Sequence, residues 1–140
     1  MQTIEATRRK IESTLNKAGL KFKMDGQGDF WVPFEDAIVF VGPASVGEVA
    51  TARVWSMVAI EIDSLDTDGL LRFLNEQNCK MVFGKLCWYP DQRTVTFETP
   101  IVAEALDKPE LQFAVLVAAK MTDTFNDTIV ARWGGRKFVA

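Results

Sequence analysis

The sequence predicts an α+β fold in which helices pack on a twisted, mainly antiparallel sheet. Apolar residues recur at helical spacing in three separate segments of the 140 residues. Between these segments lie stretches that alternate apolar and polar residues, two of which are joined by a short turn. No repeat, low-complexity tract or long linker divides the chain, so we expect one domain over residues 1–140.

The first helix is expected over residues 4–18. Ile4, Ile11 and Leu15 share one face at helical spacing. Thr3 stands where a side-chain oxygen can accept from the first free backbone N–H groups of the helix.

Several strands follow this helix. Residues 20–24 alternate apolar side chains with lysines and predict a short half-buried strand, and residues 25–29 predict a turn. Pro33 predicts a break or an edge position, because proline lacks a backbone donor. The apolar run 38–41, bounded by Gly-Pro, predicts a strand covered on both faces, and another strand is expected over residues 50–62.

The second helix is expected to start at Asp66 or Thr67 and to run through residue 78. A hairpin should follow, with strands over residues 80–89 and 94–99. Its turn is predicted at Pro90, which presets its own backbone angle, and the following aspartate accepts local hydrogen bonds.

The last helix is expected to begin at Asp107, where a cap residue is followed by an early proline, and to end before Gly134. Residues 111–119 leave hardly any polar side over two turns, and a helix that is apolar all round is buried on all sides. Two alternatives stay open: the helix is clamped between the sheet and another helix, or it meets a second copy of the protein.

Composition disfavours several classes of partner. The net charge is −3 and the pI is near 5.0, whereas nonspecific nucleic-acid binding needs a basic face. The longest purely apolar run, residues 113–119, is far shorter than the ~20 residues that span a bilayer. The N-terminal stretch is amphipathic and unlike a signal peptide, so we expect a cytoplasmic protein with no nucleic-acid or membrane partner.

Catalytic chemistry is hardly represented. The chain has no histidine, which removes Ser-His and Cys-His pairs and histidine metal sites. Cys79 and Cys87 cannot complete a structural zinc site, and we expect both thiols to be reduced. The acidic residues fall mostly at helix starts or in turns, where capping explains them. We therefore expect no enzyme, no metal and no cofactor, with a carboxylate-only enzyme as the least favoured hypothesis.

Aromatic residues are the part of the composition that a small core does not fully explain. Four tryptophans and ten phenylalanines exceed what a small core needs, although most must lie in that core. Trp55 shares its predicted strand face with Met57, and Trp88 alternates with Leu86 in the hairpin. An open apolar face on a soluble domain usually meets a partner. The predicted partner-binding residues are Trp31, Trp55, Met57 and Trp88; the competing interpretation is that the last helix covers this face.

The segment LLRFLNEQNCKMVFGKLCWYPDQRTVTFE resembles the most recognisable part of YbjN-domain proteins, in the form found in bacteria such as actinobacteria and cyanobacteria. The similarity extends to VPFEDAIVFV upstream and to ARWGG near the end, and so covers nearly the whole chain. The chain departs from the pattern in Trp88 ahead of Tyr-Pro-Asp and in its two cysteines. The shared motifs are structural and not catalytic.

The resemblance implies a fold similar to type III secretion chaperones, often homodimers that hold extended client segments without turning them over. Our leading hypothesis is a non-enzymatic, chaperone-like or regulatory homodimer that binds a protein or peptide client through an exposed aromatic-rich sheet face. The alternative is a regulator with an enclosed apolar pocket for a small molecule or lipid.

Overall fold

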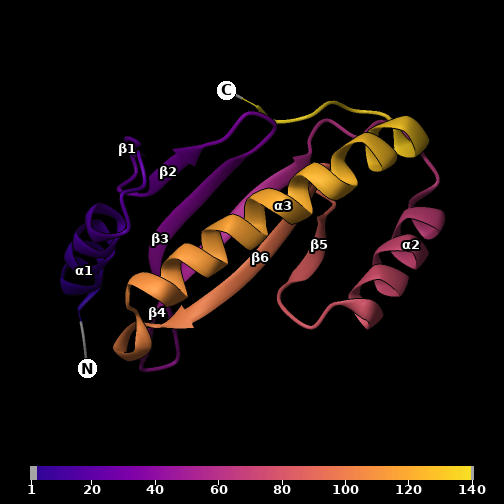
Figure 1. Cartoon of the computed structure of the whole chain (residues 1–140). Coiled ribbons are helices and arrows are strands. Elements are labelled where there is room, and N and C mark those ends of the chain that lie inside the picture. Colours follow the sequence, from indigo (N-terminus) through magenta and orange to yellow (C-terminus); the bar gives the residue numbers. More distant parts are fainter. Residues whose placement is uncertain (1–2, 140) are drawn as a thin grey trace.

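The computed structural model describes residues 3–139, whose helices and strands are labelled in Figure 1. The strands form one antiparallel sheet in the order β1-β2-β3-β4-β6-β5. The predicted α+β fold class is confirmed. The strands are β1 (Lys23–Met24), β2 (Phe30–Pro33), β3 (Ile38–Val46), β4 (Val49–Ala59), β5 (Lys85–Tyr89) and β6 (Thr94–Val102). The helices are α1 (Ile4–Lys17), α2 (Thr67–Lys80) and α3 (Lys108–Trp133), with a 3₁₀ turn, η1 (Ala103–Ala105), before α3.

The three predicted helix starts are confirmed by their caps. The side chains of Thr3, Asp66 and Asp107 each accept a hydrogen bond from the backbone N–H three residues later, at 2.9–3.0 Å. Gly134, with φ of +81°, ends α3.

Several strand boundaries were predicted wrongly: the strand expected over residues 50–62 ends at Ala59, and the one expected over residues 94–99 continues to Val102. The strand expected over residues 20–24 is only β1, because the backbone N–H of Leu20 still bonds to Leu15 of α1 at 3.2 Å. The strand expected to begin at residue 80 begins at Lys85, because α2 continues through Lys80.

The strand expected over residues 38–41 was also predicted too short. β3 passes through Gly42 and Pro43 and pairs with β4 as far as Val46. The pairing of β2 with β3 ends at Phe30 and Val41, so β3 has a strand on only one side at Pro43. The missing backbone N–H of proline therefore costs little there.

The core lies between one face of the sheet and the helices α1 and α3. In Figure 1, α3 crosses in front of the sheet and α1 lies at its left-hand side. Phe97 of β6 and Val54 of β4 are fully buried beneath α3. The second helix, α2, packs beside β5, and its Phe73 contacts Phe125 and Trp133 of α3.

Of the two alternatives for residues 111–119, a clamp between the sheet and another helix is wrong, because one side of this part of α3 is exposed in the single chain. Leu111, Ala114 and Val115 face the sheet and are buried. Phe113 and Leu116, on the opposite side of α3, are 54% and 48% exposed. A second copy of the protein remains a predicted cover for this side.

Candidate functional site

The side chains of β4 divide between the two faces of the sheet, as the alternation of the sequence predicts. Val54, Ser56 and Val58 point toward the helices and are fully buried. Trp55 and Met57 point to the opposite face, which carries no helix of the described residues (Figure 1), and both are half-buried.

Three aromatic side chains form a row across this helix-free face. The register pairs Trp31 of β2 with Phe40 of β3, and Phe40 with Trp55 of β4. The Phe40 and Trp55 rings are stacked, with centroids 5.2 Å apart and planes 19° apart. Together with Met57 these residues form what we call the aromatic face. Trp31, Trp55 and Met57, three of the four predicted site residues, are thus brought onto one surface.

Phe40 lies on the helix-free side, yet it is only 9% exposed. Trp55 covers one part of its ring, and Phe138, beyond the end of α3, lies 6.1 Å away between centroids. The segment after α3 thus contributes an aromatic side chain to the aromatic face.

A charged cluster borders the aromatic face. Glu98 of β6 stands opposite Trp55 and accepts hydrogen bonds from Arg53 at 3.0 Å, from Thr96 at 2.7 Å and from Tyr89. The Arg53 guanidinium also lies 4.4 Å from the centre of the Trp55 ring. Indole, guanidinium and carboxylate are therefore held in one fixed arrangement.

These contacts set the titration of the cluster. Burial raises the pKa of Glu98, but the hydrogen bonds from Tyr89 and Thr96 and the charge of Arg53 outweigh it, so the pKa lies below the ordinary 4.5. The hydrogen bond to Glu98, followed by burial, raises the pKa of Tyr89. The cluster is an ionised carboxylate with neutral and cationic donors, and hence a polar border of the aromatic face.

Trp88, the fourth predicted site residue, lies on the other face of the sheet. It pairs with Val95 on the helix side and packs against the core beneath the Arg93 guanidinium, 5.2 Å from its ring centre. The neighbouring Cys87 faces the helix-free side as a free thiol, and burial, the largest cause, raises its pKa. Cys79 is free and exposed.

The outer edge of β5 is occupied at its second residue. The Asn78 side chain of α2 donates to the carbonyl of Leu86 at 2.9 Å and accepts from its N–H at 2.8 Å. This amide takes the place that a neighbouring strand would have. At Leu86, strand addition to the β5 edge would first have to displace Asn78.

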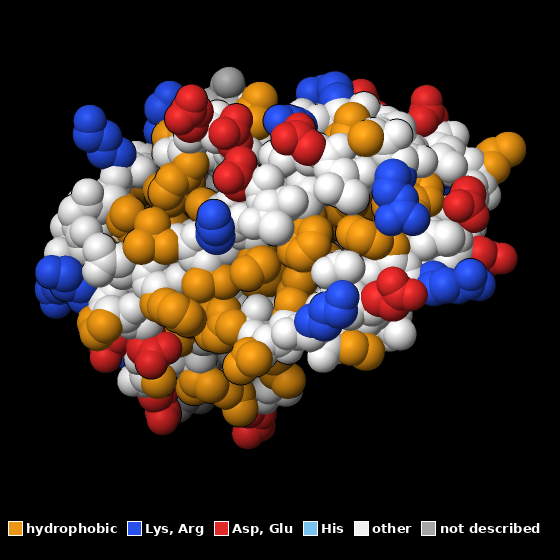
Figure 2. Space-filling model, turned by 45° about the vertical axis from the view of Figure 1, so that its right-hand side comes forward, with side chains coloured by type: hydrophobic (Ala, Val, Ile, Leu, Met, Phe, Trp, Pro, Cys, Tyr) orange, Lys and Arg blue, Asp and Glu red, His pale blue; other side chains and the backbone are white. Residues whose placement is uncertain are grey.

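An apolar groove lies on the helical side, between α3 and the α2–β5 connection. Its volume is about 410 Å³. Figure 2, with the α2 side turned forward, shows hydrophobic side chains gathered on this side among scattered charges. The apolar lining consists of Met81, Val82, Phe83, Phe113, Val117, Met121 and Phe125. Phe83 and Phe113 contact edge to face across it, with ring centroids 4.9 Å apart.

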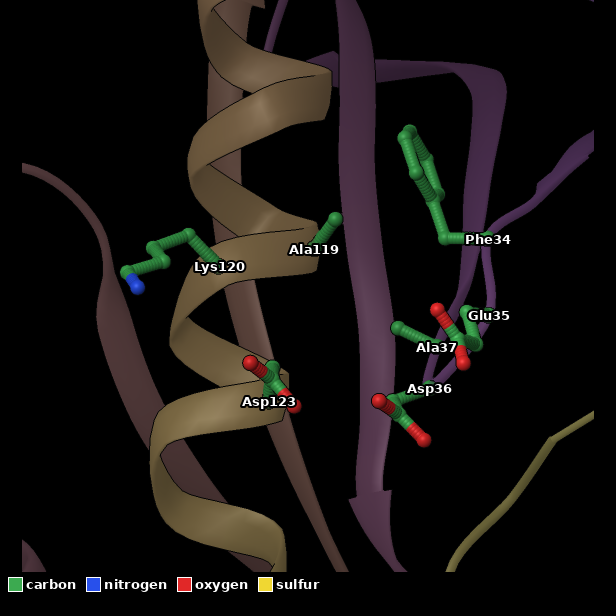
Figure 3. Close-up of a pocket in the computed structure, with 7 residues that line it drawn as sticks. All are labelled: Phe34, Glu35, Asp36, Ala37, Ala119, Lys120 and Asp123. Carbon is green, nitrogen blue, oxygen red and sulfur yellow. The ribbon is translucent and has the colours of Figure 1, made fainter.

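An acidic hollow of about 280 Å³ separates α3 from the β2–β3 turn. In Figure 3 the carboxylates of Asp36 and Asp123 lie on either side of it, whereas Lys120 points away. Nowhere in residues 3–139 do three potential metal ligands converge. The same part of the chain contains no helix suited to crossing a membrane.

Comparison with known protein families shows which family this chain belongs to. The family described as T3SS (YopN, CesT) and YbjN peptide-binding chaperone 1, or TY-Chap1, matches residues 5–140. The chain belongs to the TY-Chap1 family. This confirms the resemblance seen in the sequence and indicates a peptide-binding chaperone function in a protein that is not an enzyme. Among curated proteins, none matches the chain.

Solved structures confirm the fold of this TY-Chap1 protein. A chain of the HopA1–SchA chaperone–effector complex gives a TM-score of 0.64 at 9% identity, covering 91% of this chain and 99% of that one. The ExsC–ExsE complex gives 0.63 at 12% identity, with 91% and 96% covered. The Yersinia pestis type III secretion chaperone SycH, in complex with a YscM2 fragment, gives 0.60 at 12% identity, with 84% and 98% covered.

Sequence reasoning missed three residues of this surface. Phe40 lies within a continuous apolar run, which hides its face. Glu98 joins the surface only through cross-strand pairing with Trp55. Phe138 follows two glycines, and no local pattern marks where its side chain goes. The enclosed-pocket alternative is not favoured by membership in a chaperone family.

Proposed function

We propose that this protein is a peptide-binding chaperone that holds an extended segment of a partner protein against the aromatic face. Trp31 and Trp55 would supply rigid apolar anchors, Met57 an adaptable one, and Glu98 with Arg53 a polar edge. The row of aromatic side chains on a face without helices is the observation that carries the proposal.

The fold relatives support a binding role. All three were solved as complexes, one described as a chaperone–effector complex and one as a secretion chaperone with a fragment of another protein. A broad sheet face suits an extended segment, because successive side chains of such a segment alternate between the surface and solvent.

Capture of an unfolded client tests the proposal. The probe is reduced, carboxymethylated α-lactalbumin, and affinity is measured by fluorescence anisotropy. We expect Trp55→Ala and Trp31→Ala each to weaken binding about tenfold, as for aromatic anchors at other interfaces. Leu65→Ala is the control, because Leu65 is 94% exposed and lies outside the aromatic face.

Unchanged affinity in both Trp55→Ala and Trp31→Ala would show that the aromatic face is not the binding surface. Trp88→Ala completes the comparison, because Trp88 lies on the other face. If Trp88→Ala loses more affinity than Trp55→Ala while both variants remain folded, the client binds on the helical side and not on the aromatic face.

We also propose that the protein forms a homodimer through the apolar groove. Phe113, Leu116 and Val82 are at least 48% exposed beside it, and solvated apolar side chains in such number favour a partner surface. A two-fold contact would cover the open side of α3 in both copies.

Light scattering at micromolar concentration checks the dimer. We expect twice the monomer mass for the natural chain and the monomer mass for Phe113→Asp. Ile4→Asp on α1 is the matched control, since Ile4 is 48% exposed but lies on a different helix. A monomeric natural chain contradicts the dimer, and a dimeric Phe113→Asp contradicts its placement at the groove.

A further inference from the structure

The chain beyond α3 turns back along the sheet. Figure 1 shows it running from the end of α3 toward the β2–β3 turn. Gly134 and Gly135 both have φ of +81°. A Cβ on Gly135 would lie 2.3 Å from the carbonyl oxygen of Ile60, so only glycine permits this approach. We refer to residues 134–139 as the tail segment.

The tail segment pairs with the sheet through its backbone. Arg136 and Ile60 exchange two hydrogen bonds, both of 2.9 Å, in an antiparallel bridge just beyond the end of β4. This is the pattern of a hydrogen-bonded antiparallel pair. The tail segment therefore binds the sheet as a short added strand would.

Its side chains then contact three different groups. Arg136 pairs with Glu61 at 2.8 Å, and Phe138 approaches Phe40 on the aromatic face. Lys137 pairs with Asp127 at 2.6 Å. The hydrogen bond from Lys137 to Asp127 raises the pKa of that lysine, and the charges of Asp127, Asp36 and Asp123 act in the same direction. Asp36 and Asp123 are the carboxylates of the acidic hollow in Figure 3.

We infer that the tail segment is an internal occupant of the aromatic face, and that the client segments this face binds carry an aromatic residue directly after basic residues. This inference rests on the proposed function and names its client class. The tail segment presents the order Arg-Lys-Phe to three partners: Glu61 just beyond β4, Asp127 on α3, and Phe40 on the aromatic face.

The contacts are of a kind that a client can replace. Glu61 and Arg136 are both well exposed, and water screens such ion pairs strongly. Phe138 is partly exposed, and the tail segment begins with two glycines. A client must displace Phe138. The apparent affinity of the client is therefore its intrinsic affinity multiplied by the fraction of molecules in which the tail segment is released.

A peptide with the sequence of residues 134–139, acetylated and amidated, is the probe. It is titrated into the Phe138→Ser protein while the tryptophan indole N–H signals are followed by NMR. We expect Phe138→Ser to shift the Trp55 signal, and the peptide to return it toward its position in the natural chain. The affinity should be about tenfold higher for Phe138→Ser than for the natural chain. Val139→Ser, a neighbouring change outside the ring contact, is the control protein.

Two altered peptides examine the client class. Replacing the phenylalanine by serine should abolish binding, and replacing Arg-Lys by Glu-Glu should weaken it at least tenfold, because the acidic groups then repel the peptide. Equal binding of all three peptides, or no binding of the parent peptide to Phe138→Ser, would overturn the inference. The two experiments can fail separately. The peptide titration tests whether the tail segment occupies the aromatic face, whereas capture of unfolded α-lactalbumin by Trp55→Ala tests whether the aromatic face binds a client.

Discussion

The two faces of β4 put one strand into two environments. On the helix side Ser56 is the single polar residue between Val54 and Val58, and it is fully buried. Its Oγ lies 2.5 Å from the Thr122 hydroxyl and 3.4 Å from the Ala118 carbonyl, so the buried hydroxyl is satisfied. The helix-free face instead combines aromatic rings with ionised groups at partial exposure.

Glu98 shows what the helix-free face tolerates. Its carboxylate is only 9% exposed, yet three donors from Arg53, Tyr89 and Thr96 hold it in the ionised state. The helix side would admit such a charge only at a high desolvation cost. The difference teaches that packing under α3 supplies stability, while the opposite face holds aromatic and charged side chains that no helix of the described residues covers.

Replacing one aromatic residue on each face gives the largest expected contrast. Phe97→Ala removes a fully buried ring under α3 and should cost about 3–5 kcal/mol in the free energy of unfolding. Trp55→Ala removes a half-buried ring and its stacking on Phe40, for which we expect about 1 kcal/mol. Urea denaturation of both variants measures the difference. Equal losses would show that the two faces contribute alike to stability.

The buried hydroxyl pair offers a smaller effect. Ser56→Ala leaves the Thr122 hydroxyl without its side-chain partner and should destabilise the fold by about 1–3 kcal/mol. Adding Thr122→Val removes the second hydroxyl as well, so the double variant should lose less than the sum of the two single variants. A double-mutant cycle in urea measures this coupling, and strict additivity would contradict it.

The pH dependence of Glu98 is the mildest of the three effects. The pKa of Glu98 is lower in the folded protein than the ordinary 4.5. Ionised Glu98 therefore adds to the free energy of unfolding in full above pH 4.5, and this stabilisation is lost as the pH falls through the lowered pKa. The natural chain should therefore exceed Glu98→Gln in stability most clearly near neutral pH. The gap should narrow progressively as the pH falls below the ordinary pKa of 4.5. A gap that stays constant as the pH falls would exclude ionisation of Glu98 as its source.

Helix starts could be read from the sequence because they depend on neighbouring residues. An N-cap bond joins a side chain to a backbone group three residues away, and Thr3, Asp66 and Asp107 all make it. The alternation of β4 is equally local, since successive side chains of any strand point to opposite faces. Trp55 and Met57 were placed together on this basis alone.

Trp88 illustrates what local patterns leave open. Its face follows from the register of β5 on β6, where it pairs with Val95, and of β6 on β4, where Trp55 stands opposite Glu98. A shift of one residue in either pairing would have brought Trp88 to the side of Trp55. Spacing along the chain does not contain that register.

The sequence by itself determined the fold class, the helix starts and the two-sided character of β4, because each follows from hydrogen bonds and periodicities within a few residues. Only the tertiary structure decided which face stays free of helices, where Trp88 points and that Phe138 returns to Phe40. These are contacts between residues far apart in the chain. They form only where packing of the whole molecule repays the entropy of bringing such residues together.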